Sequence, residues 1–515
     1  MEQFHLNTGL GEVQNFPATL DGSLGKSSAP SQRAAAGFAL RGWAAWKVGV
    51  ISAGVLSSVL FVLVGLTGEL QLYADGSIFA YSIAVQDSWA IHWHNIVGRV
   101  AVYLATVLPS EVYVALTGNA RGGIVLYGLL FFSAQLVGLI ATYAADRSAG
   151  RVLFTSACLS TASLCPLVFG FPTEMWFSHA LFWPTLAFAH YAPPTLSGFA
   201  ILLAGTAALI HTHGGGVIFA AVVAFTCALR SPASHLYRIL GALSVAMVVW
   251  VSMQAAVRPD GQISPILMWA AFNFIDPRNF FDPVIGLLVV ATVGYAGLFS
   301  LIRRWGVNRP ALVAWGVTAG LLAIYWATLD DALLSEDRYF LRTALFYITP
   351  AIGLVSTLSV LQQECRLIPA LAWLPDAGQL MRNRAAPAVL TGALALVLLV
   401  HVVETGKFVS GWRDYMNALR TLASVEGPGT ETAGTRFVSS HRVQASLNGY
   451  SWSSTTHYLS IVAQPALNPA RLVIDPDEGY HWITCTLAKR HVGRHTVPER
   501  ARMLVEKHAC SLPRD

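Results

Sequence analysis

The sequence predicts an all-α polytopic membrane protein of about eleven transmembrane helices, followed by a small α+β domain outside the cytoplasm. Hydrophobic residues make up 54% of the 515 residues and charged residues only 12%, whereas about a quarter of a soluble domain is charged. The apolar residues gather in runs long enough to cross a bilayer. After residue 405 the pattern changes, and short strand-like segments alternate with Gly, Pro and Asn.

The net charge of +5 comes mainly from basic residues between the apolar runs. Basic residues there orient spans relative to the bilayer, and no nucleic-acid-binding signature accompanies them. We therefore expect membrane lipid, and no nucleic acid, as a partner.

The first 43 residues are polar and rich in Gly and Ser, a composition typical of disorder. No small-residue cleavage site follows the first apolar run, so this run predicts an uncleaved signal anchor rather than a signal peptide. Residues 1–43 are therefore expected to be a disordered cytoplasmic N-terminus.

The transmembrane domain is predicted over residues 44–405, because about 20 apolar residues in a helix cross a hydrocarbon core about 30 Å thick. Its apolar runs lie at 44–66, 122–144, 151–171, 175–190, 194–212, 215–229, 236–257, 281–302, 310–328, 342–361 and 387–405. Two of the runs, 175–190 and 215–229, are short and predict little tilt or a locally thin bilayer.

One further apolar stretch, 97–117, contains Arg99, Pro109 and Glu111. Treating it as a juxtamembrane helix within an outer loop, 67–121, keeps the basic clusters on one side of the membrane, as the positive-inside rule requires. These residues are Lys26, Arg33, Arg41, Arg147, Arg151, Arg230, Arg238, Arg303, Arg304, Arg309, Arg366, Arg382 and Arg384. Acidic residues then collect on the outer side. The N-terminus is accordingly predicted to be cytoplasmic.

The C-terminal domain, 406–515, is predicted to be extracytoplasmic because an odd number of spans precedes it. Its segments RFVSS, HYLSIVA, ARLVIDP and HWITCTL are typical of short strands. Cys485 and Cys510 are its only cysteines, and an oxidising compartment favours a disulfide between them.

The first outer loop concentrates polar and charged side chains at the membrane surface. Asp75 either forms a turn with Gly76 or supplies a catalytic or ligand-binding carboxylate. Asp87 either caps a short helix or binds a substrate. His92 and His94 either anchor the loop in the interface or bind a substrate, together with Arg99.

Two more groups of candidates follow on the same side. Glu174 begins a short span, where an ionisable residue is costly to bury and so is a functional candidate. His211 and His213 come just before a hinge of three glycines, which either lets the backbone approach an anion closely or forms a tight hairpin.

The last candidates, Arg338 and Tyr339, lead into a late span. The guanidinium of Arg338 matches phosphate oxygens at the level of a lipid headgroup. It serves equally well as a partner for Glu336 or Asp337 or as an anchor to bulk lipid.

This layout resembles the integral-membrane glycosyltransferases of the GT-C fold, which take sugars from polyprenyl-phosphate donors. The resemblance covers nearly the whole chain in layout and rests on Asp75 in the first outer loop and on Arg338-Tyr339 before a late span. It implies a lipid-linked sugar donor and a glycan or lipid acceptor in the cell envelope, at the plasma (inner) membrane. It also implies Asp75 as general base. The chain departs from the stricter family pattern, since Gly76-Ser77 follows Asp75 where a second acid is expected.

In this chemistry a cation stabilises the leaving lipid phosphate, and Arg338 is the first choice, with His211, His213 and Arg99 as alternatives. Carboxylates such as Asp75 suit Mg²⁺ or Mn²⁺, but the sequence assigns no metal ligands. A transporter or flippase for a lipid-linked or anionic substrate, and a non-catalytic membrane assembly protein, remain alternatives.

Overall fold

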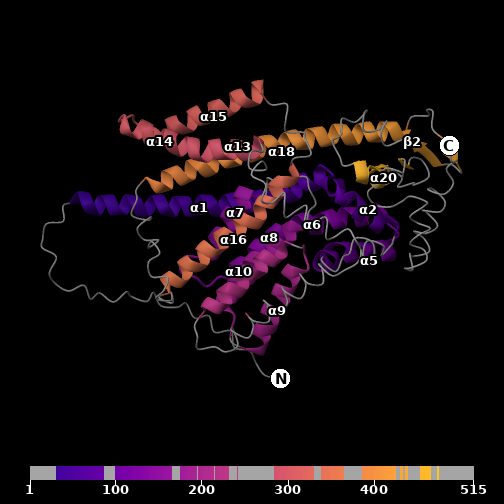
Figure 1. The fold of residues 1–515 in the computed structure, drawn as a ribbon, viewed down its shortest axis with the longest axis horizontal. Coiled ribbons are helices and arrows are strands. Elements are labelled where there is room, and N and C mark those ends of the chain that lie inside the picture. Colours follow the sequence, from indigo (N-terminus) through magenta and orange to yellow (C-terminus); the bar gives the residue numbers. More distant parts are fainter. Residues whose placement is uncertain are drawn as a thin grey trace.

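The computed structural model describes residues 30–85, 99–164, 174–193, 195–213, 215–230, 241, 283–329, 338–364, 385–424, 430–432, 435–438, 453–464 and 473–474. These residues are mostly helical (Figure 1). In the first half of the chain the elements are α1 (Pro30–Thr67), η1 (Leu70–Leu72), α2 (Asp75–Val85), α4 (Val100–Val102), η3 (Tyr103–Val107), α5 (Leu108–Thr117), α6 (Ala120–Ala145), α7 (Val152–Leu164), α8 (Met175–Tyr191), α9 (Leu196–Ile210) and α10 (Gly216–Leu229). In the second half they are α13 (Pro283–Val289), η6 (Val290–Gly294), α14 (Tyr295–Arg304), α15 (Pro310–Thr328), α16 (Arg338–Gln363), α18 (Ala386–Ser424), β1 (Thr430–Thr432), β2 (Thr435–Val438), α20 (Ser453–Val462) and β3 (Val473–Ile474).

Six helical stretches among the described residues are long and apolar enough to cross a membrane. They are Gly42–Thr67, Val100–Thr117, Ala120–Ala145, Gly286–Arg304, Pro310–Thr328 and Ala386–Leu422. Each predicted apolar run other than 236–257 overlaps a helix among the described residues, and of 236–257 only residue 241 is described. The apolar helices α7, α9 and α10 are shorter than a full span. The fold is thus compatible with a multi-pass membrane protein.

The chain before and after the stretch Val100–Thr117 contacts the C-terminal part of the protein. Glu69, just after α1, forms an ion pair with Arg420. Arg121, in the first turn of α6, donates a hydrogen bond to the Gln464 carbonyl 2.5 Å away and lies within the electrostatic reach of Glu69 and Arg420. These contacts join the segment after α1 and the first turn of α6 to the C-terminal region. The assignment of Val100–Thr117 as a juxtamembrane helix stays a prediction, because its length and hydropathy also suit a span.

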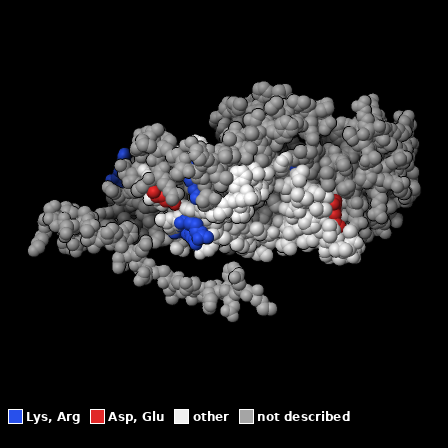
Figure 2. Space-filling view, turned by 90° about the horizontal axis from the view of Figure 1, so that it is seen from below, with Lys and Arg blue, Asp and Glu red and all other residues white. Residues whose placement is uncertain are grey.

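Basic side chains cap helix ends at the opposite end of the bundle. The ammonium group of Lys47, early in α1, bonds the carbonyl of Gly150. Arg151 donates to the Tyr143 carbonyl near the end of α6, at 2.8 Å, and Arg230 donates to a carbonyl near the end of α8. Cations are favourable at helix C-termini. On the face that Figure 2 shows, most of the visible Lys and Arg side chains of the described residues lie in the left half of the view.

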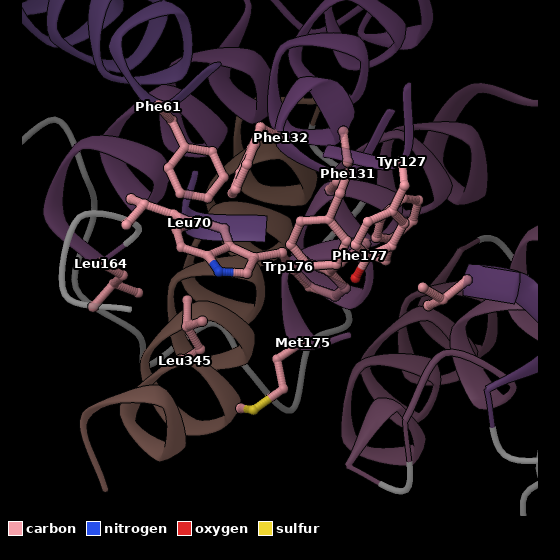
Figure 3. Close-up of a cluster of buried hydrophobic side chains, with 14 of the residues drawn as sticks. Phe61, Leu70, Tyr127, Phe131, Phe132, Leu164, Met175, Trp176, Phe177 and Leu345 are labelled. Atoms are coloured by element: carbon pink, nitrogen blue, oxygen red, sulfur yellow. The ribbon is translucent and has the colours of Figure 1, made fainter. Parts of the chain in front are cut away.

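Aromatic rings form the centre of the main hydrophobic core. The ring of Phe61 in α1 lies 5.0 Å from Phe132 in α6 and 4.4 Å from Trp176 in α8, between centroids. Leu164 of α7 and Leu345 of α16 belong to the same buried cluster as Trp176 (Figure 3). A second core joins α13, α14 and α15 to α18, on the side of α18 away from α8 (Figure 1).

Helices α6 and α8 approach closely at Gly138. A Cβ atom there would lie 2.5 Å from the backbone oxygen of Ala180, a contact that requires the helices to separate. We expect Gly138→Ala to lower stability by about 1–3 kcal/mol, the usual cost of overpacking. Thermal unfolding in detergent measures it. Gly316→Ala is the control, because nothing lies within 4 Å of its added Cβ; equal melting temperatures for the two variants would contradict the expectation.

Two helices extend beyond the predicted boundaries. Helix α1 begins at Pro30, within the stretch expected to be disordered, and an Ala-rich sequence that favours helix follows it. Helix α18 continues to Ser424, well past the predicted span and boundary at 405. Its 39 residues measure roughly 58 Å at 1.5 Å per residue, about twice the thickness of a hydrocarbon core.

The C-terminal region contains one small sheet. Strand β1 pairs antiparallel with β2, with Glu431 opposite Arg436, and β2 pairs parallel with β3, with Phe437 opposite Val473. Strand β2 overlaps the predicted segment RFVSS, and β3 lies within ARLVIDP. HWITCTL, Cys485 and Cys510 lie outside the described residues.

The prediction of a strand at HYLSIVA is wrong, since these residues lie mainly in α20. A strand turns alternate side chains to opposite faces, which suits one buried face. Here the consecutive residues Tyr458, Leu459, Ser460, Ile461 and Val462 are all buried. Tertiary packing around a short helix therefore overrides the β-propensity of the aromatic and branched residues.

Candidate functional site

Asp75 opens the first turn of α2. The chain enters this helix through Ala74, whose φ of 49° lies in the left-handed region, and the Ser77 hydroxyl donates to the Ala74 carbonyl at 2.8 Å. Asp75-Gly76 is therefore part of a helix start rather than a turn between elements. A carboxylate is favourable there because the helix N-terminus carries partial positive charge.

Arg99 joins two acids that are far apart in the sequence. Its Nη1 atom lies 2.9 Å from Oε1 of Glu174 and 3.9 Å from Oδ2 of Asp75. The side chain of Glu174 is only 3% exposed, whereas those of Asp75 and Arg99 are 18% and 28% exposed. The cation offsets the repulsion between the two carboxylates, and solvent still reaches Asp75.

A small, mostly apolar pocket adjoins this ion-pair group. Arg99 and Glu174 form its charged wall, and the remaining wall is apolar or aromatic: Phe79, Val102, Tyr103, Val107, Tyr127 and Phe131. Phe79 lies one helical turn after Asp75, so both residues share a face of α2. The pocket is also lined by the π-helical segment η3, and such segments occur frequently at functional sites.

The hinge between α9 and α10 packs against the same group. The backbone N–H of Ala101 donates to the His211 carbonyl at 3.1 Å, two residues from Arg99. Thr212 exchanges a hydrogen bond with Ser178, one turn along α8 from Glu174. The structure thus brings the predicted hinge to Asp75, Arg99 and Glu174.

Part of the hinge sequence has a local structural explanation. A Cβ atom on Gly216 would lie 2.0 Å from the Leu209 carbonyl oxygen, so the tight connection itself requires glycine there. The Nδ1 atom of His213 accepts a hydrogen bond from the Gly215 N–H at 3.1 Å. These contacts support the prediction of a tight hairpin. That His211 contacts a ligand stays a prediction.

Arg338 and Tyr339 are the first residues of α16, and their side chains lie outside the described part of the structure. Helix α16 runs parallel to α8, because Thr349 lies near His179 and Thr357 near His190 along the two helices. The start of α16 therefore lies at the same end of the bundle as Glu174. Asp87, His92 and His94 lie outside the described residues.

Sequence reasoning missed a buried polar chain just below the site. Gln135 donates from Nε2 to the Trp176 carbonyl at 2.8 Å, and its Oε1 accepts from Nδ1 of His179 at 2.8 Å. The Nε2 atom of His179 then accepts from Ser160 at 2.9 Å, and Thr349 lies 3.2 Å from Ser160. The signal was Gln135 itself, a strongly polar residue within an apolar run. The chain ties α6, α7, α8 and α16 together beneath Glu174.

No known family model, curated protein or solved structure matches the chain. The function of the site is therefore inferred from its own chemistry. Within the described residues, no three His, Cys, Asp or Glu side chains lie close enough together to hold a metal ion. What the site does present is two carboxylates held by one guanidinium, beside an aromatic pocket.

Proposed function

We propose that the protein is a membrane glycosyltransferase of the GT-C type. It moves a sugar from a lipid-phosphate donor to a glycan or lipid acceptor at the outer face of the plasma (inner) membrane. The observation that carries the proposal is the ion-pair group, in which Arg99 joins Asp75 and Glu174. It is supported by the position of this group, which lies where the candidate span α1 ends.

Asp75 acts as the general base. Its carboxylate takes the proton of the acceptor hydroxyl while the acceptor oxygen bonds to the anomeric carbon of the sugar. The bond between that carbon and the phosphate oxygen breaks, and the lipid phosphate leaves with the electron pair. The partial exposure of Asp75 supports this assignment, because an acceptor must reach the carboxylate.

Arg99 and Arg338 have different roles in this mechanism. Arg99 positions the acids, since it already forms an ion pair with the buried carboxylate of Glu174. Arg338 stabilises the charge that develops on the leaving phosphate. The parallel packing of α16 and α8 supports this division, because it puts the start of α16 at the same end of the bundle as Glu174.

The direct test uses the purified protein in lipid nanodiscs with a panel of sugars linked to polyprenyl phosphate. We expect release of polyprenyl phosphate and transfer of one of the sugars to a hydroxyl acceptor, measured by chromatography of the lipid products. If no donor of the panel is consumed with any glycan or lipid acceptor, the proposal is wrong.

The second candidate is a flippase for a lipid-linked or anionic substrate, favoured by the buried polar chain from Gln135 through His179 to Thr349. Polar residues inside a bundle mark the pathways of many transporters. Proteoliposomes that move a fluorescent polyprenyl phosphate between leaflets, without consuming sugar donors, would select this function.

A further inference from the structure

Helix α20 of the C-terminal region packs on α2, the helix that begins with Asp75. The rings of Tyr458 and Tyr81 lie 5.3 Å apart between centroids, and Tyr458 is fully buried. Burial raises the pKa of Tyr458. A segment nearly four hundred residues along the chain thereby covers the helix that places the proposed base.

Two arginines from the rest of the bundle bind the C-terminal end of α20. The Nε atom of Arg420 donates to the Ala463 carbonyl at 3.1 Å, and Nη2 of Arg121 donates to the Gln464 carbonyl at 2.5 Å. Helix C-termini leave carbonyls without partners inside the helix and carry partial negative charge. The two guanidinium groups meet both needs.

Arg420 also joins α20 to the segment that leads into α2. Arg420 forms an ion pair with Glu69, six residues before Asp75. Tyr73, two residues before Asp75, packs its ring 5.0 Å from Phe408 and 5.2 Å from Trp412, both in α18. The extension of α18 beyond the predicted span therefore holds the entry to α2, while α20 covers the helix itself.

We infer that α20 is a positioning element for the site, and that Arg420 and Arg121 hold it against α2 so that Asp75 stays beside Arg99. The C-terminal region and the membrane domain then form one functional unit. The inference rests on the proposed function for its effect on turnover, whereas docking and the position of α2 are measured separately.

The experiment uses the full chain in nanodiscs with one added cysteine as a reporter, either Ser460→Cys in α20 or Ser82→Cys in α2, beside the six native cysteines. Both serines are buried, so a water-soluble maleimide labels them only when the helices move, and peptide mass spectrometry assigns the label. We expect Arg420→Gln to raise the labelling rate at both reporters about tenfold, because a lost charge-assisted hydrogen bond shifts a local opening equilibrium by about that factor. Arg413→Gln, at an exposed arginine on the same helix, should leave both rates unchanged.

Arg420→Lys keeps the positive charge without the planar fork and should recover part of the protection. Unchanged labelling at Ser460→Cys in the Arg420→Gln variant would overturn the docking contact. Faster labelling at Ser460→Cys alone, with Ser82→Cys still protected, would overturn the positioning of α2. Sugar transfer at the wild-type rate in a variant labelled at both sites would also overturn it. Absence of transfer in the wild-type protein would instead count against the proposed function, and the labelling rates would still decide the docking.

Discussion

Asp75→Asn is expected to lower the turnover number of sugar transfer by a factor of about 10²–10⁴, the usual contribution of a general base. Asparagine has nearly the same size and keeps a hydrogen-bonding oxygen, but it does not accept the proton of the acceptor hydroxyl. The affinity for the lipid-linked donor should change little, because the base contacts the acceptor. Donor consumption at saturating substrate, measured alongside donor binding, checks both statements.

The matched control for this substitution is Asp414→Asn, at an exposed acid on α18. It removes one negative charge on a different helix and should leave the turnover number unchanged. If Asp75→Asn transfers sugar as fast as the wild-type protein, Asp75 is not the base and the mechanism fails.

Arg99→Gln is expected to lower both stability and activity. Glu174 would remain buried without the guanidinium 2.9 Å from its carboxylate, and breaking a buried pair costs about 3–5 kcal/mol. Because Arg99 is itself 28% exposed, solvent screens part of the interaction, and we expect a loss of about 2 kcal/mol. The apparent melting temperature in nanodiscs measures it.

A double-mutant cycle with Glu174→Gln isolates the pair. The neutral double variant should regain part of the stability, since no carboxylate is left buried at residue 174, with a coupling energy of about 1–2 kcal/mol. Activity should not return with stability, because the group that positions Asp75 is then absent. If the double variant loses as much stability as the two single variants together, Arg99 and Glu174 do not interact.

Most helices were predicted well, because a long apolar run must pair its own backbone hydrogen-bonding groups when its side chains are buried. A run such as 122–144 buries its side chains in lipid or against other helices, and a helix satisfies its backbone hydrogen bonds internally. The prediction failed where propensity competes with packing: HYLSIVA is rich in branched and aromatic residues, yet its helix is stabilised by burial against α2. The length of α18 was missed because its extension, after residue 405, is amphipathic rather than continuously apolar.

The sequence by itself determined the helical class, the positions of most apolar helices, and the choice of Asp75, Arg99, Glu174 and the His211–His213 hinge as candidates. These follow from composition and from the cost of placing ionisable groups at a membrane. Only the tertiary structure decided that Arg99 bridges Asp75 to Glu174, that Gln135 and His179 support them, and that two arginines fix α20 over α2. Those pairings join residues from about 24 to more than 300 positions apart, and no local pattern encodes which distant helix ends meet.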